Sequence, residues 1–212
     1  LDLSAAPVAS TRELLHTLDM TPSGKVAASL NIDVTSLRRS EALSRNNILI
    51  RPNPTTVEYF LDDRWAASVS TVVSEKLEAE FGAPATGRET VQLVGTIVAF
   101  ERLDTPQGAV GHVKLDATLQ GGAQQGESRP LLWKVYEASS PAGGNSAAAV
   151  AVALSHAVEE VAASIVADAE RIPPAATTPR APEVHLFTLD MTPSGKVQCK
   201  HNVMFDRIQP ND

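Results

Sequence analysis

Histidine and cysteine are the residues of this chain whose chemistry most often serves metal binding or nucleophilic catalysis. The histidines are His16, His112, His156, His185 and His201. No two of them form an H-x-x-x-H or H-E-x-x-H pair, the spacings that bring two ligands to one helix face. A metal site between His16 and His185 would need two distant segments to meet, and exposed histidines on strands are the more common case. Cys199 is the only cysteine, and we interpret it as a small apolar side chain rather than a catalytic thiol. We therefore predict neither a metal nor a cofactor.

Two other groupings resemble catalytic pairs. Asp62 and Asp63 are adjacent carboxylates, but a cap at the start of a helix explains them better than acid–base catalysis. Ser155 and His156 are neighbours on a predicted helix, where adjacent side chains point apart, so they are not a nucleophile and its base. The nucleophile-elbow and dinucleotide-binding patterns G-x-S-x-G and G-x-G-x-x-G are both absent. The sequence therefore predicts a protein with no catalytic residues, and not an enzyme.

A ten-residue segment, TLDMTPSGKV, occurs twice: a first copy at residues 17–26 and a second copy at residues 188–197. Each copy places a proline where it presets the first corner of a turn and a glycine where a left-handed conformation closes it. These turn residues are Pro22 and Gly24 in the first copy and Pro193 and Gly195 in the second. We predict one β-hairpin at 14–35 and a repeat of it at 184–212. A duplicated structural hairpin is favoured over a duplicated binding site, and the P-loop spacing G-x-x-x-x-G-K is absent.

The composition indicates a globular protein and excludes some partners. The 212 residues are 43% hydrophobic and 20% charged, which suits one domain with extensions or two very small domains. The net charge is −7 and no stripe of lysine and arginine occurs, so nucleic acid is excluded as a partner. We expect no membrane span, because the longest apolar stretches are interrupted by polar residues. The chain begins at Leu1 without a methionine, a basic region or an apolar leader, and we expect a processed or trimmed product.

The elements that would position these residues follow from hydrophobic periodicity. Residues 65–81 are predicted to form an amphipathic helix, which Asp62 or Asp63 caps and Gly82 ends. We interpret Trp65 as the residue that anchors this helix to the sheet, in preference to a residue that contacts a ligand. Residues 91–100 are apolar on both faces, which predicts a central strand that is covered on both sides. Further strands are predicted at 47–51, 56–61, 110–119 and 131–138, and a long helix at 146–170.

The predicted fold class is α/β or α+β: a mixed, largely antiparallel sheet covered by two helices, plus a C-terminal hairpin extension. The predicted organisation is an N-terminal tether at 1–13, the sheet-and-helix domain at 14–171, a Pro-rich linker at 172–183 and the repeated hairpin at 184–212.

The order of these features resembles the ABC-type transport auxiliary lipoprotein family of Gram-negative bacteria. A first strand ending in a "TL" pair is followed by ILIRP, by VEYFLDDRWAASVSTVVSEKLEAEF, by VQLVGTIVAFE and by the Ala-rich helix AAVAVALSHAVEEVAASIVADA. The resemblance covers about residues 14–170. Its sharpest element is Asp63-Arg64-Trp65, with Phe100 as support.

The resemblance implies a non-enzymatic, periplasmic accessory subunit of a lipid-transporting ABC system that bridges the transporter and the outer membrane. It implies a transporter or mammalian-cell-entry-type protein as partner, lipid as a candidate cargo, and a lipidated N-terminal cysteine in the full-length precursor. That anchor cysteine does not occur in this chain. The alternative is an envelope lipoprotein that scaffolds or activates cell-wall or secretion machinery without handling lipid. The C-terminal hairpin is expected to dock on the sheet of its own chain, and the alternative is self-association, in which it extends the sheet of a second copy.

Overall fold

The structure is a computed structural model that describes residues 13–121 and 129–172. The second copy, with Pro193 and Gly195, and the predicted hairpin at 184–212 lie outside the described residues, as do nearly all of the predicted tether and linker. The strands are β1 (Leu14–His16), β2 (Asn31–Arg39), β3 (Asn47–Asn53), β4 (Thr56–Trp65), β5 (Thr90–Thr105), β6 (Gly108–Gly121) and β7 (Pro130–Pro141). The helices are α1 (Val69–Phe81), α2 (Ala147–Ala169) and a short 3-10 turn at Glu41–Leu43.

The long strand β5 organises one mixed sheet. One edge of β5 pairs with β6 in antiparallel fashion along its whole length, and β7 continues the sheet beyond β6. On its other edge β5 holds two parallel partners, β2 along residues 90–97 and β3 along residues 101–103. β4 forms an antiparallel pair with β3, and β1 closes this side in parallel with β4. The predicted class, a mixed and largely antiparallel sheet with two helices, is confirmed.

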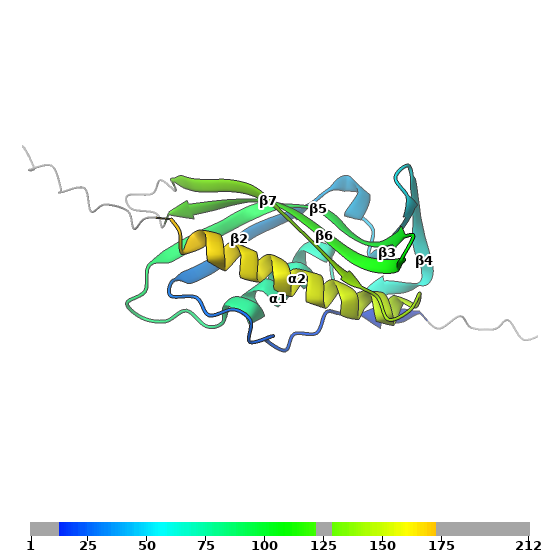
Figure 1. Cartoon of the computed structure of the whole chain (residues 1–212), viewed down its shortest axis with the longest axis horizontal. Coiled ribbons are helices and arrows are strands. Elements are labelled where there is room, and N and C mark those ends of the chain that lie inside the picture. The colour runs from blue at the N-terminus through cyan, green and yellow to red at the C-terminus, as the bar shows by residue number, and fades with distance from the viewer. Residues whose placement is uncertain (1–12, 122–128, 173–212) are drawn as a thin grey trace, which may run out of the picture. The chain divides into compact units, whose positions relative to one another are not determined.

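Both helices lie on one face of this sheet, with α2 against β6 and β7 and α1 against β2 (Figure 1). Alternation in β6 places Val113, Leu115, Ala117 and Leu119 in the core at 1% exposure each, as the sequence predicts. The predicted stripe of α2 is buried as well: Val150, Leu154, Val158, Val161 and Ile165. A Cβ added to Gly111 would lie 2.6 Å from the backbone nitrogen of Leu154, so β6 needs glycine where α2 crosses it.

The helix α2 is more apolar than predicted from the sequence. Its length and its mean hydropathy of 1.6 are those of a membrane-crossing helix, so the expectation of no such stretch is wrong by this criterion. In the described structure, however, 67% of that apolar window is buried, and its apolar stripe packs on the sheet. The helix is therefore a core element of this domain.

The predicted hairpin at 14–35 is wrong. β1 pairs with β4 and β2 pairs with β5, so the two predicted arms are not neighbours. Between them, residues 17–30 contain no strand. Polar atoms of this stretch bind helix side chains instead of a neighbouring strand, and Pro22 has no N–H to donate to a ladder. Gly24 does have the expected left-handed conformation, with φ of +71°.

The predicted start of the first helix is also wrong. Trp65 is the last residue of β4, because β1 pairs with residues 63–65 and holds them extended. The helix begins at Val69, and the cap is Ser68, whose hydroxyl accepts a hydrogen bond of 3.2 Å from the Thr71 backbone amide. Asp62 and Asp63 lie in β4 and cap nothing. The predicted end at Gly82 is confirmed, with φ of +74°.

Smaller differences concern the strands β5, β3 and β4. β5 is central, as predicted, but it is not covered on both sides: Leu93, Ile97 and Phe100 are fully buried, whereas Val98 is 44% exposed. Both β3 and β4 run further than predicted. Pro52 lies inside β3, beyond the three residues that pair with β5, so its missing N–H removes no bond to the central strand.

Candidate functional site

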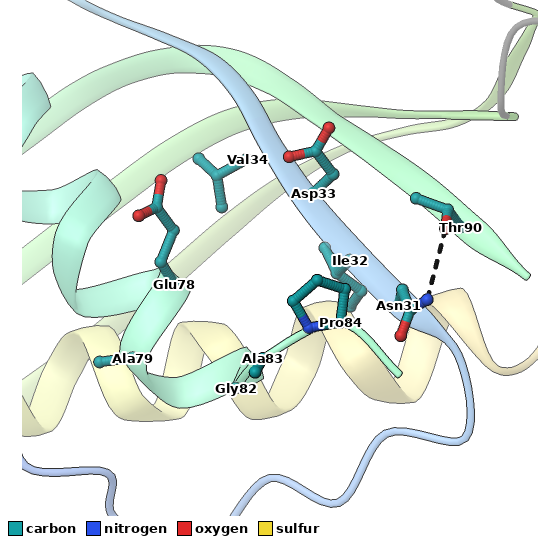
Figure 2. A pocket seen from close by; sticks show the side chains of 10 residues that line it. All are labelled: Asn31, Ile32, Asp33, Val34, Glu78, Ala79, Gly82, Ala83, Pro84 and Thr90. Carbon is teal, nitrogen blue, oxygen red and sulfur yellow. Dashed lines mark hydrogen bonds between the residues drawn. The ribbon is translucent and has the colours of Figure 1, made fainter. Parts of the chain in front are cut away.

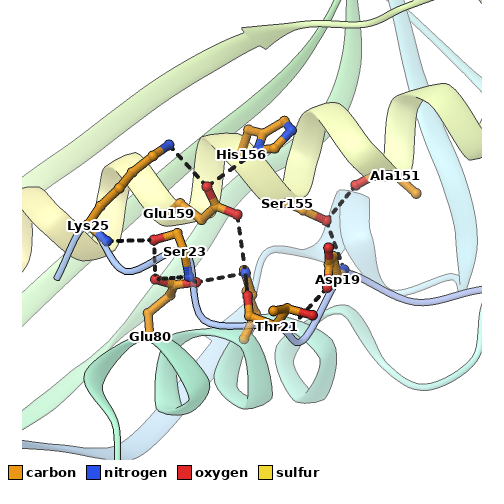
Figure 3. A network of polar contacts seen from close by, with 10 residues as sticks. Asp19, Thr21, Ser23, Lys25, Glu80, Ala151, Ser155, His156 and Glu159 are labelled. Carbon is orange, nitrogen blue, oxygen red and sulfur yellow. Dashed lines mark hydrogen bonds and ion pairs between the residues drawn. The ribbon is translucent and has the colours of Figure 1, made fainter.

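The first copy of the repeated segment lies across α1 and α2 (Figure 3). Leu18 inserts into the core at 2% exposure, and the Asp19 backbone amide donates a hydrogen bond of 3.0 Å to the Ser155 hydroxyl on α2. Further along, the backbone amide and hydroxyl of Ser23 both donate to the Glu80 carboxylate on α1, at 2.9 and 2.6 Å. The segment is therefore held by specific contacts to both helices.

Beneath the first copy lies a buried cluster of charged side chains from the two helices. The Lys76 ammonium is completely buried and lies 2.8 Å from the Glu80 carboxylate and 3.3 Å from that of Glu159. It also donates a bond of 3.0 Å to the Thr21 backbone carbonyl in the first copy. From outside, the half-exposed Lys25 ammonium reaches Glu159 at 3.1 Å. Each charge is thus paired inside the protein, as buried charges must be.

The electrostatics of this cluster favour the charged state of both carboxylates. Burial alone would raise the pKa of Glu80, but hydrogen bonds from Lys76 and Ser23 outweigh it and hold that pKa below its usual value. Burial opposes the ionisation of Glu159 in the same way, and Lys25, His156 and Lys76 together lower its pKa. The arrangement can hold a peptide with hydroxyl, amide and ammonium donors.

This cluster is not among the sites predicted from the sequence. Lys76 and Glu80 stand four residues apart on a helix, a spacing that ordinarily indicates an exposed ion pair. One pattern in the sequence does indicate that Lys76 is buried. It stands next to Leu77 on the helix face that also carries the apolar residues Val69, Val72 and Val73.

The predicted motif Asp63-Arg64-Trp65 is the part of β4 that pairs with β1. These three residues pair in register with Leu14, Leu15 and His16. The Asp63 carboxylate lies 2.6 Å from the His16 imidazole, and the Arg64 guanidinium forms an ion pair with Glu13.

Two of the predicted site residues, Trp65 and Phe100, lie in the core. The Trp65 ring is 2% exposed and lies 5.0 Å from that of Phe100, centroid to centroid, at an angle of 48°. Of the predicted turn residues, Pro22 and Gly24 lie in the first copy over the helices. The motif Asp63-Arg64-Trp65 therefore lies beside β1, and Phe100 packs against the Trp65 ring.

The face of the sheet opposite the helices carries a row of alternating charges. Arg51 on β3 lies 2.7 Å from Glu101 on β5, and the same carboxylate lies 3.5 Å from His112 on β6. His112 in turn lies 2.9 Å from Glu137 on β7, whose second oxygen is 3.0 Å from Lys114. The row crosses four adjacent strands and joins them on this side.

We predict that His112 titrates above the usual histidine value of about 6.5. The Glu101 carboxylate, together with Glu137, raises the pKa of His112 despite its partial burial. A raised folded-state pKa contributes stability that is fully present below about pH 6.5 and is lost as the pH rises through the folded-state value. NMR titration of the imidazole should show the raised pKa, and Glu101→Gln should lower it more than Glu137→Gln. An unshifted titration would contradict this geometry.

Exposed apolar side chains lie beside this charged row. Trp133 is 67% exposed, and its indole N–H donates a bond of 2.6 Å to the Asp116 carboxylate. Val135, two residues along β7, and Val98 on β5 are 38% and 44% exposed. No helix in the described part of the chain covers this face. A large aromatic ring among aliphatic side chains is typical of surfaces that bind other proteins.

An open pocket of about 860 Å³ lies between the end of α1 and the start of β2 (Figure 2). Its lining is mixed: Asn31, Asp33, Glu78 and Thr90 are polar, and Ile32, Val34 and Pro84 are apolar. The amide of Asn31 bonds to Thr90 at 3.4 Å at one side of the opening.

Comparison with solved structures shows the same fold elsewhere. One is the crystal structure of a Xanthomonas campestris protein assigned to family DUF330, which is 18% identical, with a TM-score of 0.54 over 72% of this chain and 91% of that one. Another is the crystal structure of an uncharacterised protein that is 11% identical, with a TM-score of 0.58 over 74% of this chain and 99% of that one. At these identities the likeness concerns the fold alone. A search of curated proteins finds no match.

The sequence itself matches one family model over residues 16–166, from β1 through most of α2. The match spans the motif in β4, the central strand β5 and the helix that covers the sheet. The chain therefore belongs to the family described as the ABC-type transport auxiliary lipoprotein component.

Proposed function

We propose that the chain is a non-enzymatic accessory subunit of an envelope ABC transport system that moves lipid, located in the periplasm and bridging the transporter to the outer membrane. The observation that carries the proposal is the family match over residues 16–166. The partner would be a transporter or mammalian-cell-entry-type protein, and the precursor would be anchored at the outer membrane. Self-association through residues 184–212 stays a prediction from the sequence.

The exposed face of the sheet supports a role in binding another protein. Trp133 offers a large aromatic surface, and the charged row beside it supplies polar groups that can fix the orientation of a partner. We place the contact with the transport system on this face.

The test is co-purification of the full chain with the permease, ATPase and mammalian-cell-entry-type protein of the same organism. Trp133→Glu should abolish co-purification, because it places a charge at the centre of the proposed contact. Val152→Glu is the matched control, since Val152 is 56% exposed on α2 and lies on the helix side of the domain. Equal capture by both variants would contradict the proposed surface, and no capture by the wild-type chain would contradict the proposed function.

The alternative function is an envelope scaffold that handles no lipid. The observation that favours it is the pocket beside α1, whose lining includes Asp33 and Glu78 and so suits an acyl chain poorly. Native mass spectrometry of the chain purified from membranes, followed by lipid extraction, separates the two. Phospholipid that co-purifies in stoichiometric amount supports lipid handling, and its absence supports the scaffold.

A further inference from the structure

The strand β2 has a strand partner on one edge only in the part of the chain that the structure describes. That partner is β5, and the Asn31 backbone amide begins this side of β2 with a bond of 2.8 Å to the Glu89 carbonyl. Backbone groups of successive strand residues point to alternate edges, so the amides and carbonyls of Ile32 and Val34 point away from β5. Among the described residues, β2 therefore presents an open edge that can pair with another strand.

The pocket beside α1 lies along this open edge (Figure 2). Residues 31–34 of β2 form one wall, and the other wall comes from the end of α1 and the turn after it: Glu78, Ala79, Gly82, Ala83 and Pro84. The Asn31 side chain ties the two walls together, because it donates a bond of 3.0 Å to the Ala85 carbonyl and accepts one of 2.9 Å from the Ala85 amide. A groove held in this way needs little reordering when a ligand binds.

The open edge is short, which limits the ligand that can pair with it. The register with β5 shifts between Val34 and Ser36, and the exposed Arg38 follows this bulge. Bulges and charged side chains are the features by which proteins protect strand edges from unwanted pairing. The unprotected part is residues 31–34, about 13 Å of extended chain at the usual rise of a strand. The groove therefore suits a short extended peptide.

The side chains along the groove specify the chemistry of that peptide. Asp33 and Glu78 are exposed carboxylates, and neither forms an ion pair with another described residue. Ile32, Val34 and Pro84 supply apolar surface between them. Along β2, Asp33 points to one face of the sheet and its two neighbours point to the other. A strand beside β2 would place one row of side chains next to Asp33, where a lysine or arginine is favoured, and the alternate row next to the aliphatic side chains.

We propose that the groove between β2 and the end of α1 binds an extended peptide of a partner protein in which basic and aliphatic residues alternate, and that the peptide adds to residues 31–34 as a new strand. Main-chain bonds to Ile32 and Val34 supply affinity, and the carboxylates of Asp33 and Glu78 supply selectivity. This inference goes beyond the proposed transport function and does not rest on it.

The test is an NMR titration of the isotope-labelled full chain with a short capped peptide of alternating lysine and valine. We expect the largest changes in amide chemical shift at residues 31–34 and 78–84. A matched peptide with glutamate in place of lysine should bind about tenfold more weakly, because it places like charges beside Asp33 and Glu78. The lysine–valine peptide methylated at every backbone nitrogen keeps its side chains but cannot donate to β2, and it should not bind. The proposal is overturned if the unmethylated peptide does not bind, if methylation leaves binding unchanged, or if the shift changes lie on another surface.

Charge-reversal variants separate recognition in the groove from general attraction, since the chain has a net charge of −7 and attracts any basic peptide. In the double variant Asp33→Lys/Glu78→Lys the preference should reverse, so that the glutamate–valine peptide binds more tightly than the lysine–valine peptide. The matched control is Glu58→Lys/Glu160→Lys, which changes the net charge equally at two exposed residues that do not line the groove. This control should keep the wild-type preference. Equal loss of lysine–valine binding in both double variants would overturn the groove as the binding site.

Discussion

Replacement of Trp65 by alanine should lower the free energy of unfolding by about 3–5 kcal/mol, the usual cost of emptying a large buried aromatic site. The side chain is 2% exposed, and its ring contacts that of Phe100 under the two helices. Its backbone also joins β4 to the rest of the fold, since the Trp65 amide donates a bond of 2.7 Å to the Asn46 carbonyl. Urea denaturation followed by circular dichroism would measure the loss.

The second tryptophan of the chain is the matched control for this prediction. Trp133 is 67% exposed, so Trp133→Ala should change the free energy of unfolding by no more than about 0.5 kcal/mol. Trp65→Phe keeps a ring against Phe100 and should restore most of the stability that Trp65→Ala loses. If Trp65→Ala were as stable as Trp133→Ala, the ring would have to lie outside the core and be available to a ligand.

The central elements of the fold could be predicted because their patterns are local and repetitive. The alternation in residues 110–119 identified the buried face of β6, and the stripe from Val150 to Ile165 identified the buried face of α2. These long periodic segments leave little choice of secondary structure, because a shift of one residue in a strand would expose every apolar side chain.

The errors concern places where a distant partner decides the local conformation. Residues 62–65 read as the start of a helix, but parallel pairing with β1, almost fifty residues earlier, holds them extended. Residues 17–26 read as one arm and the turn of a hairpin, because Thr-Pro-Ser-Gly is typical turn sequence. Their actual partners are Ser155, Glu80 and Glu159 on two helices, and no local pattern contains that information.

The charged cluster was missed for a similar reason. A lysine and a glutamate four residues apart usually face solvent, and burial of Lys76 depends on the first copy and α2 closing over it from two sides. The sequence does mark Asp63-Arg64-Trp65 as a motif. Its role, which is to pair with β1, cannot be predicted without knowing which strand lies beside it.

Replacement of Lys76 by methionine should destabilise the protein by about 3 kcal/mol at pH 7, the lower part of the range for breaking a buried ion pair. Methionine fills similar space, so the loss comes from two buried carboxylates and the Thr21 carbonyl that lose their common donor. The loss of unfolding free energy is at the lower end of that range because Glu80 keeps its hydrogen bonds from Ser23, and Glu159 keeps its ion pair with Lys25. Lys25→Met is the control: Lys25 is 52% exposed, and its removal should cost no more than about 1 kcal/mol.

The pH dependence of the Lys76→Met effect distinguishes an electrostatic loss from a packing loss. In the wild type, the pKa values of Glu80 and Glu159 are lowered by their partners against the opposing effect of burial. The two carboxylates therefore contribute stability above the unfolded-state pKa of about 4.3, and that contribution is lost as the pH falls through the folded-state values. Without Lys76, fewer favourable contacts offset the effect of burial on the ionisation of Glu80 and Glu159. Protonation of these carboxylates at low pH removes the buried charges and so reduces the destabilisation of the variant. The difference in unfolding free energy between wild type and Lys76→Met should thus shrink as the pH falls from 7 to about 4. A difference that stays constant over this range would mean that the cost is one of packing, and that the cluster does not hold the first copy through its charges.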